Sequence, residues 1–104
     1  MLTADELGLF RVVAASGRAK EAIRFAHEFI RPLADADTTL LETWRAFVRA
    51  EGKVHATAAE LGVHENTIRY RLAKIRQHVA QDPTTLDGLF QARLAFQILD
   101  LAGW

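Results

Sequence analysis

The sequence predicts an all-α fold, and three observations support that prediction. Apolar residues recur at the three- to four-residue spacing of amphipathic helices, and no alternating stretch is long enough to indicate a sheet. Capping residues and glycines mark helix starts and ends. Residues 58–72 have helix-turn-helix spacing: small Ala58 allows two helices to approach closely, Gly62 suits a left-handed turn, and Ile68 fixes the second helix to the core.

The composition fits one soluble domain and excludes several kinds of chemistry. The chain has 104 residues, is 50% hydrophobic and can bury a modest core. Because it has no cysteine, it forms no disulfide, thiolate zinc site or thiol nucleophile. It shows no signal-peptide pattern and no apolar run near the roughly 20 residues that span a bilayer. We therefore expect a cytoplasmic protein with no membrane partner.

Helix starts are predicted at three threonines that each precede an acidic residue by three positions. Thr3, Thr39 and Thr84 resemble capping boxes or their aspartate variant. The first helix is expected from about residue 4 to 15, although residues 9–13 could equally be a strand from a missing neighbouring domain. A second amphipathic helix ends or kinks at Pro32, which lacks a backbone donor, and it buries Ala22, Ile23, Ala26, Phe29 and Ile30.

Four further helices are expected after the linker 34–38. The first runs from Leu40 to about Glu51 with Gly52 as its C-cap, and it places Leu40, Leu41, Trp44, Phe47 and Val48 on one face. The helix-turn-helix pair covers residues 54–61 and about 65–79, and Asp82-Pro83 closes it. The last helix, about 85–101, is apolar over more than half its circumference. It is either sandwiched in the core or partly reserved for another chain.

The second helix of the motif has one apolar and one polar face. At 100° per residue, Ile68, Leu72, Ile75 and Val79 face the core, and the opposite sector holds Asn66, Tyr70, Ala73 and Gln77. Such a surface suits the DNA major groove, because amides and arginines match the hydrogen-bonding edges of bases. Since base contacts come from the N-terminal turns, the base-reading candidates are Glu65, Asn66, Arg69 and Tyr70. The phosphate candidates are Thr67, Arg71 and Lys74.

Three of these positions have two interpretations. Glu65 either stabilises the helix dipole, which we prefer, or accepts from cytosine N4. His64 is the expected N-cap and either caps the helix, the preferred use, or approaches a phosphate. Arg71 either contacts a phosphate or pairs with an acid such as Glu60.

The net charge of zero does not exclude a nucleic-acid partner, because charge is unevenly distributed. Residues 64–81 carry four basic residues, Arg69, Arg71, Lys74 and Arg76, against the single acid Glu65, which gives a local charge of +3. Charges act on phosphates over a Debye length of about 8 to 10 Å, so the local excess decides attraction. Overall neutrality predicts modest non-specific affinity.

Enzymatic and metal chemistry have no supporting pattern. None of the histidines, at 27, 55, 64 and 78, lies three or four residues from another on a common helix, and no phosphate loop or hydrolase motif occurs. We expect no enzyme, metal or cofactor. Trp44 and Trp104 are interpreted as packing residues.

Residues 41–47 and 56–75, with the signature His64-x-Asn66-Thr67-x-x-Tyr70-Arg71-Leu72, carry a family resemblance. The sequence from about 39 to 101 resembles the C-terminal helix-turn-helix of PucR-type bacterial regulators, which include the sugar-diacid regulators. The resemblance implies a Fis-like DNA-binding domain at residues 39–104, with residues 1–38 a helical connector from an upstream, effector-binding domain. This sequence departs from the family pattern at two positions. Lys53 stands where such domains often have asparagine, and Glu65 stands where they often have arginine or proline.

The sequence thus predicts a helix-turn-helix domain that binds double-stranded DNA as a homodimer or higher oligomer. The wide apolar surface of the last helix motivates the expected self-association. The alternative is a helical protein-interaction module that keeps the motif only as scaffold. A third hypothesis, a catalytic helical domain, would require clustered carboxylates or histidines in a pocket.

Overall fold

The computed structural model describes residues 11, 15–34 and 37–103. These residues form helices and no strand, which confirms the predicted all-α fold. The helices are α2 (Ala19–Ala34), α3 (Thr38–Arg49), α4 (Val54–Leu61), α5 (Glu65–His78) and α6 (Leu86–Leu101). The expected helix over 4–15, its strand alternative and the predicted roles of Thr3 and Trp104 lie outside the described residues.

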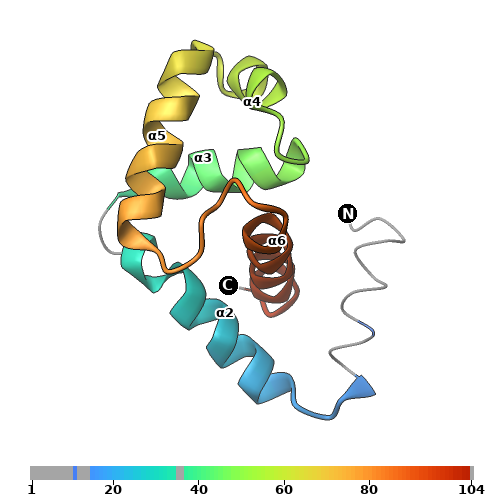
Figure 1. The fold of residues 1–104 in the computed structure, drawn as a ribbon. Helices are drawn as coiled ribbons and strands as arrows, with labels where there is room; N and C mark the ends of the chain where they lie inside the picture. Colours follow the sequence, from blue (N-terminus) through green and yellow to red (C-terminus); the bar gives the residue numbers. More distant parts are fainter. Residues whose placement is uncertain (1–10, 12–14, 35–36, 104) are drawn as a thin grey trace.

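Helix α3 is the central element of the fold. It contacts the α4–α5 pair on one side and the α2–α6 pair on the other (Figure 1). Trp44 on α3 is completely buried, as expected. Its ring stacks on Phe29 of α2 at 5.2 Å between centroids and meets Phe96 of α6 edge-on at 5.5 Å. These contacts join α2, α3 and α6 in one aromatic cluster.

One hydrophobic core includes residues from every described helix. Helix α2 contributes Ala26, Ile30 and Leu33, with Ala22, Ile23 and Phe29 partly buried against them. The five residues expected to form its apolar face therefore do so. Helix α2 lies in the segment interpreted as a connector, and it packs on the same core as the helix-turn-helix.

The helix caps correct two of the predicted starts. Asp37, not Thr39, caps α3, because its carboxylate accepts from the backbone N–H groups of Thr39 and Leu40 at 2.9 and 3.4 Å. A carboxylate also stabilises the positive end of the helix dipole. Thr85, not Thr84, caps α6 by accepting from the Gly88 N–H at 3.0 Å. The Thr84 hydroxyl instead donates to Asp82 at 2.6 Å.

Two predicted helix ends also differ. Pro32 does not end α2, which continues to Ala34. The proline removes only one backbone donor in the last turn, and Leu33 is fully buried against the core. The C-cap of α3 is Ala50 rather than Gly52. Both Glu51 and Gly52 adopt left-handed backbone, with φ of 57° and 78°, and the Gly52 N–H donates to Phe47 O at 2.9 Å. The turn begins earlier because it uses two left-handed residues.

Helix α6 is mostly sandwiched in the core, so intrachain packing accounts for much of its wide apolar surface. Its buried residues include Ala92, Ala95, Phe96, Ile98 and Leu99. Leu86 and Phe90, one turn apart near its start, remain 82% and 52% exposed. Within the described residues, no helix has both the length and the apolar character needed to cross a bilayer.

Gly88 allows α6 to pass close to the preceding loop, and Gly88→Ala tests this constraint. A Cβ at position 88 would overlap the backbone carbonyl of Asp82. We expect a loss of about 1 to 3 kcal/mol in unfolding free energy, the usual cost of overpacking, measured by denaturant titration. The control Leu86→Ala, at an exposed neighbouring position, should change stability little. Equal stability of both variants would show that the loop yields freely.

Candidate nucleic-acid interface

The turn between α4 and α5 has the predicted geometry. Gly62 ends α4 with left-handed backbone, φ 67° and ψ 35°. The Val63 N–H donates to Ala58 O at 3.0 Å and the Gly62 N–H to Ala59 O at 3.4 Å, which together form a Schellman motif. Ala58 is buried between the helices. The small residue and the glycine therefore act as the sequence indicated, and they set the direction in which α5 leaves.

His64 caps α5, as preferred from the sequence. Its Nδ1 accepts from the Asn66 N–H at 3.0 Å, and its backbone is extended. Because Nδ1 accepts this bond, a proton on the neutral ring must sit on Nε2. The histidine is exposed, so capping leaves its outer edge open to solvent.

Helix α5 divides into the predicted faces. Ile68, Leu72 and Ile75 are buried, and Val79 packs partly against them. On the opposite side Asn66, Arg69, Ala73 and Gln77 are exposed, and Tyr70 is 62% exposed. The Lys74 ammonium lies 5.5 Å from the centroid of the Tyr70 ring, within the range of a cation–π interaction. The base-reading candidates on this face are all accessible.

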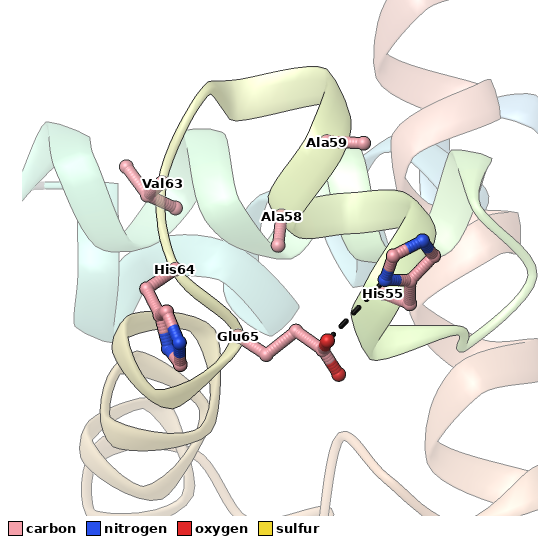
Figure 2. A pocket seen from close by; sticks show the side chains of 6 residues that line it. All are labelled: His55, Ala58, Ala59, Val63, His64 and Glu65. Atoms are coloured by element: carbon pink, nitrogen blue, oxygen red, sulfur yellow. Dashed lines mark hydrogen bonds and ion pairs between the residues drawn. The ribbon is translucent and has the colours of Figure 1, made fainter.

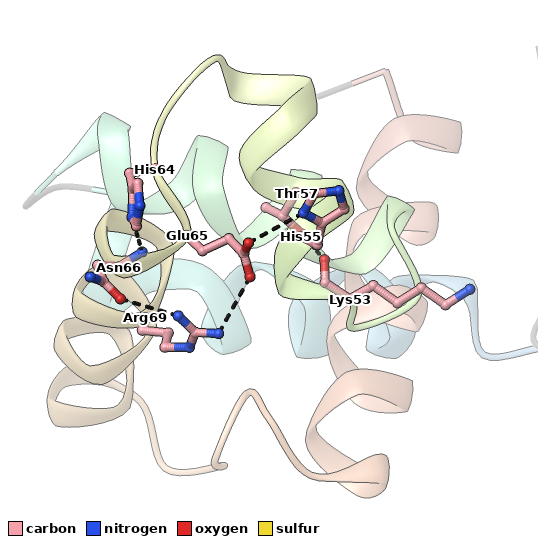
Figure 3. A network of polar contacts seen from close by, with 7 residues as sticks. All are labelled: Lys53, His55, Thr57, His64, Glu65, Asn66 and Arg69. Carbon is pink, nitrogen blue, oxygen red and sulfur yellow. Dashed lines mark hydrogen bonds and ion pairs between the residues drawn. The ribbon is translucent and has the colours of Figure 1, made fainter.

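Glu65 links two other candidate residues, Arg69 and through it Asn66, to His55 of α4 (Figure 3). Its Oε1 accepts from Arg69 Nη2 at 3.4 Å, and its Oε2 lies 3.3 Å from His55 Nδ1. Arg69 Nη1 also donates to Asn66 Oδ1 at 3.2 Å. Glu65 stands in the first turn of α5, where it favours the helix dipole. The structure thus adds a pairing function to the dipole role expected for it.

His55 is a member of this cluster that the sequence analysis did not select. It lies on α4, and ten residues separate it from Glu65. Helical spacing shows only neighbours on one helix, so no sequence signal could have joined the pair.

The phosphate candidates are less exposed than Asn66, Arg69 and Tyr70. Thr67, Arg71 and Lys74 are half-buried. Arg71 Nη1 lies 3.3 Å from Thr43 Oγ1 of α3. The alternative considered for Arg71, a pairing with an acid such as Glu60, is not found: Glu60 accepts from Arg49 at 2.8 Å, because the end of α3 lies beside α4. The hydrogen bond and charge of Arg49 lower the pKa of Glu60.

Folding reduces the local charge counted along the sequence. Arg76, at the last turn of α5, pairs with Asp82 at 3.2 Å. Hydrogen bonds from the Thr84 hydroxyl and N–H, with Arg76 nearby, lower the pKa of Asp82. The excess positive charge therefore lies toward the first three turns of α5, where base-reading residues are expected.

A shallow crevice of about 220 Å³ separates α4 from the start of α5 (Figure 2). Its floor is apolar, and the Glu65 side chain extends across it toward His55. The lining residues are His55, Ala58, Ala59, Val63, His64 and Glu65. Among the described residues, no group of three or more histidine, aspartate or glutamate side chains is placed to hold a metal ion.

Residues 40–98 match the family model of the PucR C-terminal helix-turn-helix domain. An uncharacterized protein of Mycobacterium tuberculosis is 39% identical over 82 residues, which cover 79% of this chain and 20% of that protein. The transcriptional activator PmfR of Paenarthrobacter nicotinovorans is 36% identical over 81 residues, covering 75% and 17%. An uncharacterized protein of Thermomonospora curvata is 38% identical over 65 residues, covering 60% and 36%. The chain spans about a fifth of the length of the first of these relatives.

The left-handed backbone at position 62 gives a prediction that separates conformation from packing. No atom lies within 4 Å of a Cβ built on Gly62, so Gly62→Ala should cost only the strain of a left-handed backbone, about 1 to 2 kcal/mol of unfolding free energy. Gly62→Asn should lose less, because asparagine adopts this conformation more readily. Thermal unfolding of both variants measures the difference. Equal losses would mean that an unseen contact, rather than φ, requires glycine.

Proposed function

Because the chain belongs to the PucR C-terminal helix-turn-helix family, we propose that it is the sequence-specific DNA-binding part of a bacterial transcriptional regulator. Helix α5 lies in the major groove in this proposal. The observation that carries it is the exposed polar face of α5, on which Asn66, Arg69 and Tyr70 stand at the N-terminal turns. Helices of this motif read bases from those turns.

The remaining candidates position the helix on the DNA backbone. Lys74 and Arg71 supply charge to phosphates, Thr67 a hydroxyl, and His64 both caps α5 and presents its outer edge to the backbone. Glu65 is the exception, because a carboxylate close to phosphates is repelled unless a cation neutralises it. Its contact with the Arg69 guanidinium meets that need.

The regulator as a whole extends beyond this chain. The matched residues make up only 20% of the first relative and 17% of the second, and the name of the second is transcriptional activator. We propose that an upstream domain binds the effector, that the DNA-binding part needs no cofactor and has no enzymatic activity, and that the protein works in the cytoplasm. Two copies with two-fold symmetry would bind paired half-sites.

The DNA surface is tested by removing three cations from α5. The Arg69/Arg71/Lys74 triple-alanine variant should lose binding to a randomised duplex, measured by fluorescence anisotropy at about 50 mM and about 200 mM salt. Wild-type binding should fall steeply between these concentrations, since phosphate contacts release counterions. Lys74→Ala alone should weaken all sequences and reduce the salt slope by about one.

A matched control variant removes three positive charges from another part of the surface. Arg18, Lys20 and Arg24 are exposed at and near the start of α2, which Figure 1 places at the opposite end of the molecule from the α4–α5 turn. Their triple-alanine variant should bind almost as the wild type does. Equal losses in both triples would show that net charge, not α5, drives binding, and a folded wild type that binds no duplex at low salt would reject the proposal.

A second candidate function, a protein-interaction or oligomerisation surface, is favoured by the exposed pair Leu86 and Phe90. Large apolar side chains adjacent on a surface often mark contact sites. If this pair forms the homodimer contact, sedimentation equilibrium at micromolar concentration should give the mass of two chains. The Leu86→Glu/Phe90→Glu variant should then give one. A wild-type mass of one chain would remove this surface as a self-association site for the isolated chain.

A further inference from the structure

Asn66 and Arg69 form a coupled pair that presents donors outward. Arginine has only N–H donors, so the group that faces it must be the amide oxygen of Asn66. Figure 3 shows Oδ1 directed at Arg69 and the amide nitrogen directed away. To bridge adenine, an asparagine offers its oxygen to N6 and its nitrogen to N7. In this arrangement the oxygen needed for N6 is already turned toward Arg69.

The pair therefore matches an edge made of acceptors. Each terminal nitrogen of Arg69 carries two N–H groups and uses one within the protein, so each keeps one for a base. The amide nitrogen of Asn66 adds further donors. In the major groove guanine offers two acceptors, N7 and O6, whereas adenine offers an acceptor beside a donor.

We propose that Asn66 and Arg69 act as one unit that reads guanine, and that Glu65 is the positioning residue of this unit. The proposal rests on the proposed DNA-binding function and deepens it by naming the preferred base. It also replaces one use considered from the sequence, a cytosine contact for Glu65.

The position of Glu65 supports its indirect role. Both carboxylate oxygens have a partner, Arg69 on one side and His55 on the other. The side chain is only 38% exposed, against 58% for Arg69, and it extends across the crevice toward α4 (Figure 2). A carboxylate held in this way orients the Arg69 guanidinium, and the guanidinium neutralises the charge of the carboxylate. Arg69 remains the more accessible of the two groups.

Recognition of guanine is tested with base analogues. Sites are first selected from a random duplex pool with the 104-residue chain, and the guanine whose preference disappears in Arg69→Ala is identified. Replacing it with 7-deazaguanine removes the N7 acceptor, whereas inosine keeps N7 and O6 in the major groove and lacks only the N2 amino group. Wild-type affinity should fall about fivefold or more with 7-deazaguanine, at the lower end of the discrimination of a bidentate contact. It should stay nearly constant with inosine.

The variants separate positioning from direct contact. Asn66→Ala and Glu65→Ala should each lower the guanine-to-7-deazaguanine affinity ratio, and neither should lower it further once Arg69 is alanine. Glu65→Gln keeps an acceptor oxygen for Arg69 and should restore part of the ratio. Arg24→Ala, on exposed α2 surface, serves as the control and should keep the wild-type ratio.

The outcomes distinguish this inference from the function on which it rests. If the wild type selects no duplex at low salt, the proposed DNA binding fails. If it selects sites but the base lost with Asn66→Ala is adenine, or 7-deazaguanine has no effect, DNA binding stands and guanine reading is overturned. If Glu65→Ala lowers the ratio equally with or without Arg69, Glu65 does not act through Arg69.

Discussion

Burial of Trp44 on the central helix is the interaction on which the rest of the structure depends. The indole lies between Phe29 of α2 and Phe96 of α6, while the same helix supports α4 and α5. These contacts are aromatic and apolar, and this packing fixes the platform from which α5 projects.

Surface ion pairs distribute the charge of a neutral chain. Asp100 pairs with Arg45, Glu60 with Arg49 and Asp82 with Arg76, at 2.8 to 3.2 Å. Exposed pairs of this kind contribute little to stability, because water and salt screen the attraction between the charges. Their effect on electrostatics is larger, because the acids neutralise arginines away from the N-terminal turns of α5. A protein with no net charge can in this way keep a locally basic surface.

The candidate interface is organised before any ligand is present. The Schellman turn at Gly62 and the His64 cap fix the first turn of α5. Contacts among Glu65, Arg69 and Asn66 then restrict the conformations in which these side chains meet a ligand. Preorganisation lowers the conformational entropy lost on binding. It also couples the residues, so their contributions to recognition should not be additive.

The sequence by itself determined the helical class, the helix-turn-helix and the core face of α5, because these depend on spacing within one helix or across one short turn. The bounds of α4 and the roles of Ala58, Gly62 and His64 agree with the prediction. The caps at Thr39 and Thr84 were misplaced because nearby aspartate and threonine side chains compete for the same backbone donors. Only the tertiary structure decided that Glu60 pairs with Arg49, that Glu65 reaches His55, and that most of α6 is sandwiched in the core. These contacts join different helices, and helical periodicity carries no information about which helices meet.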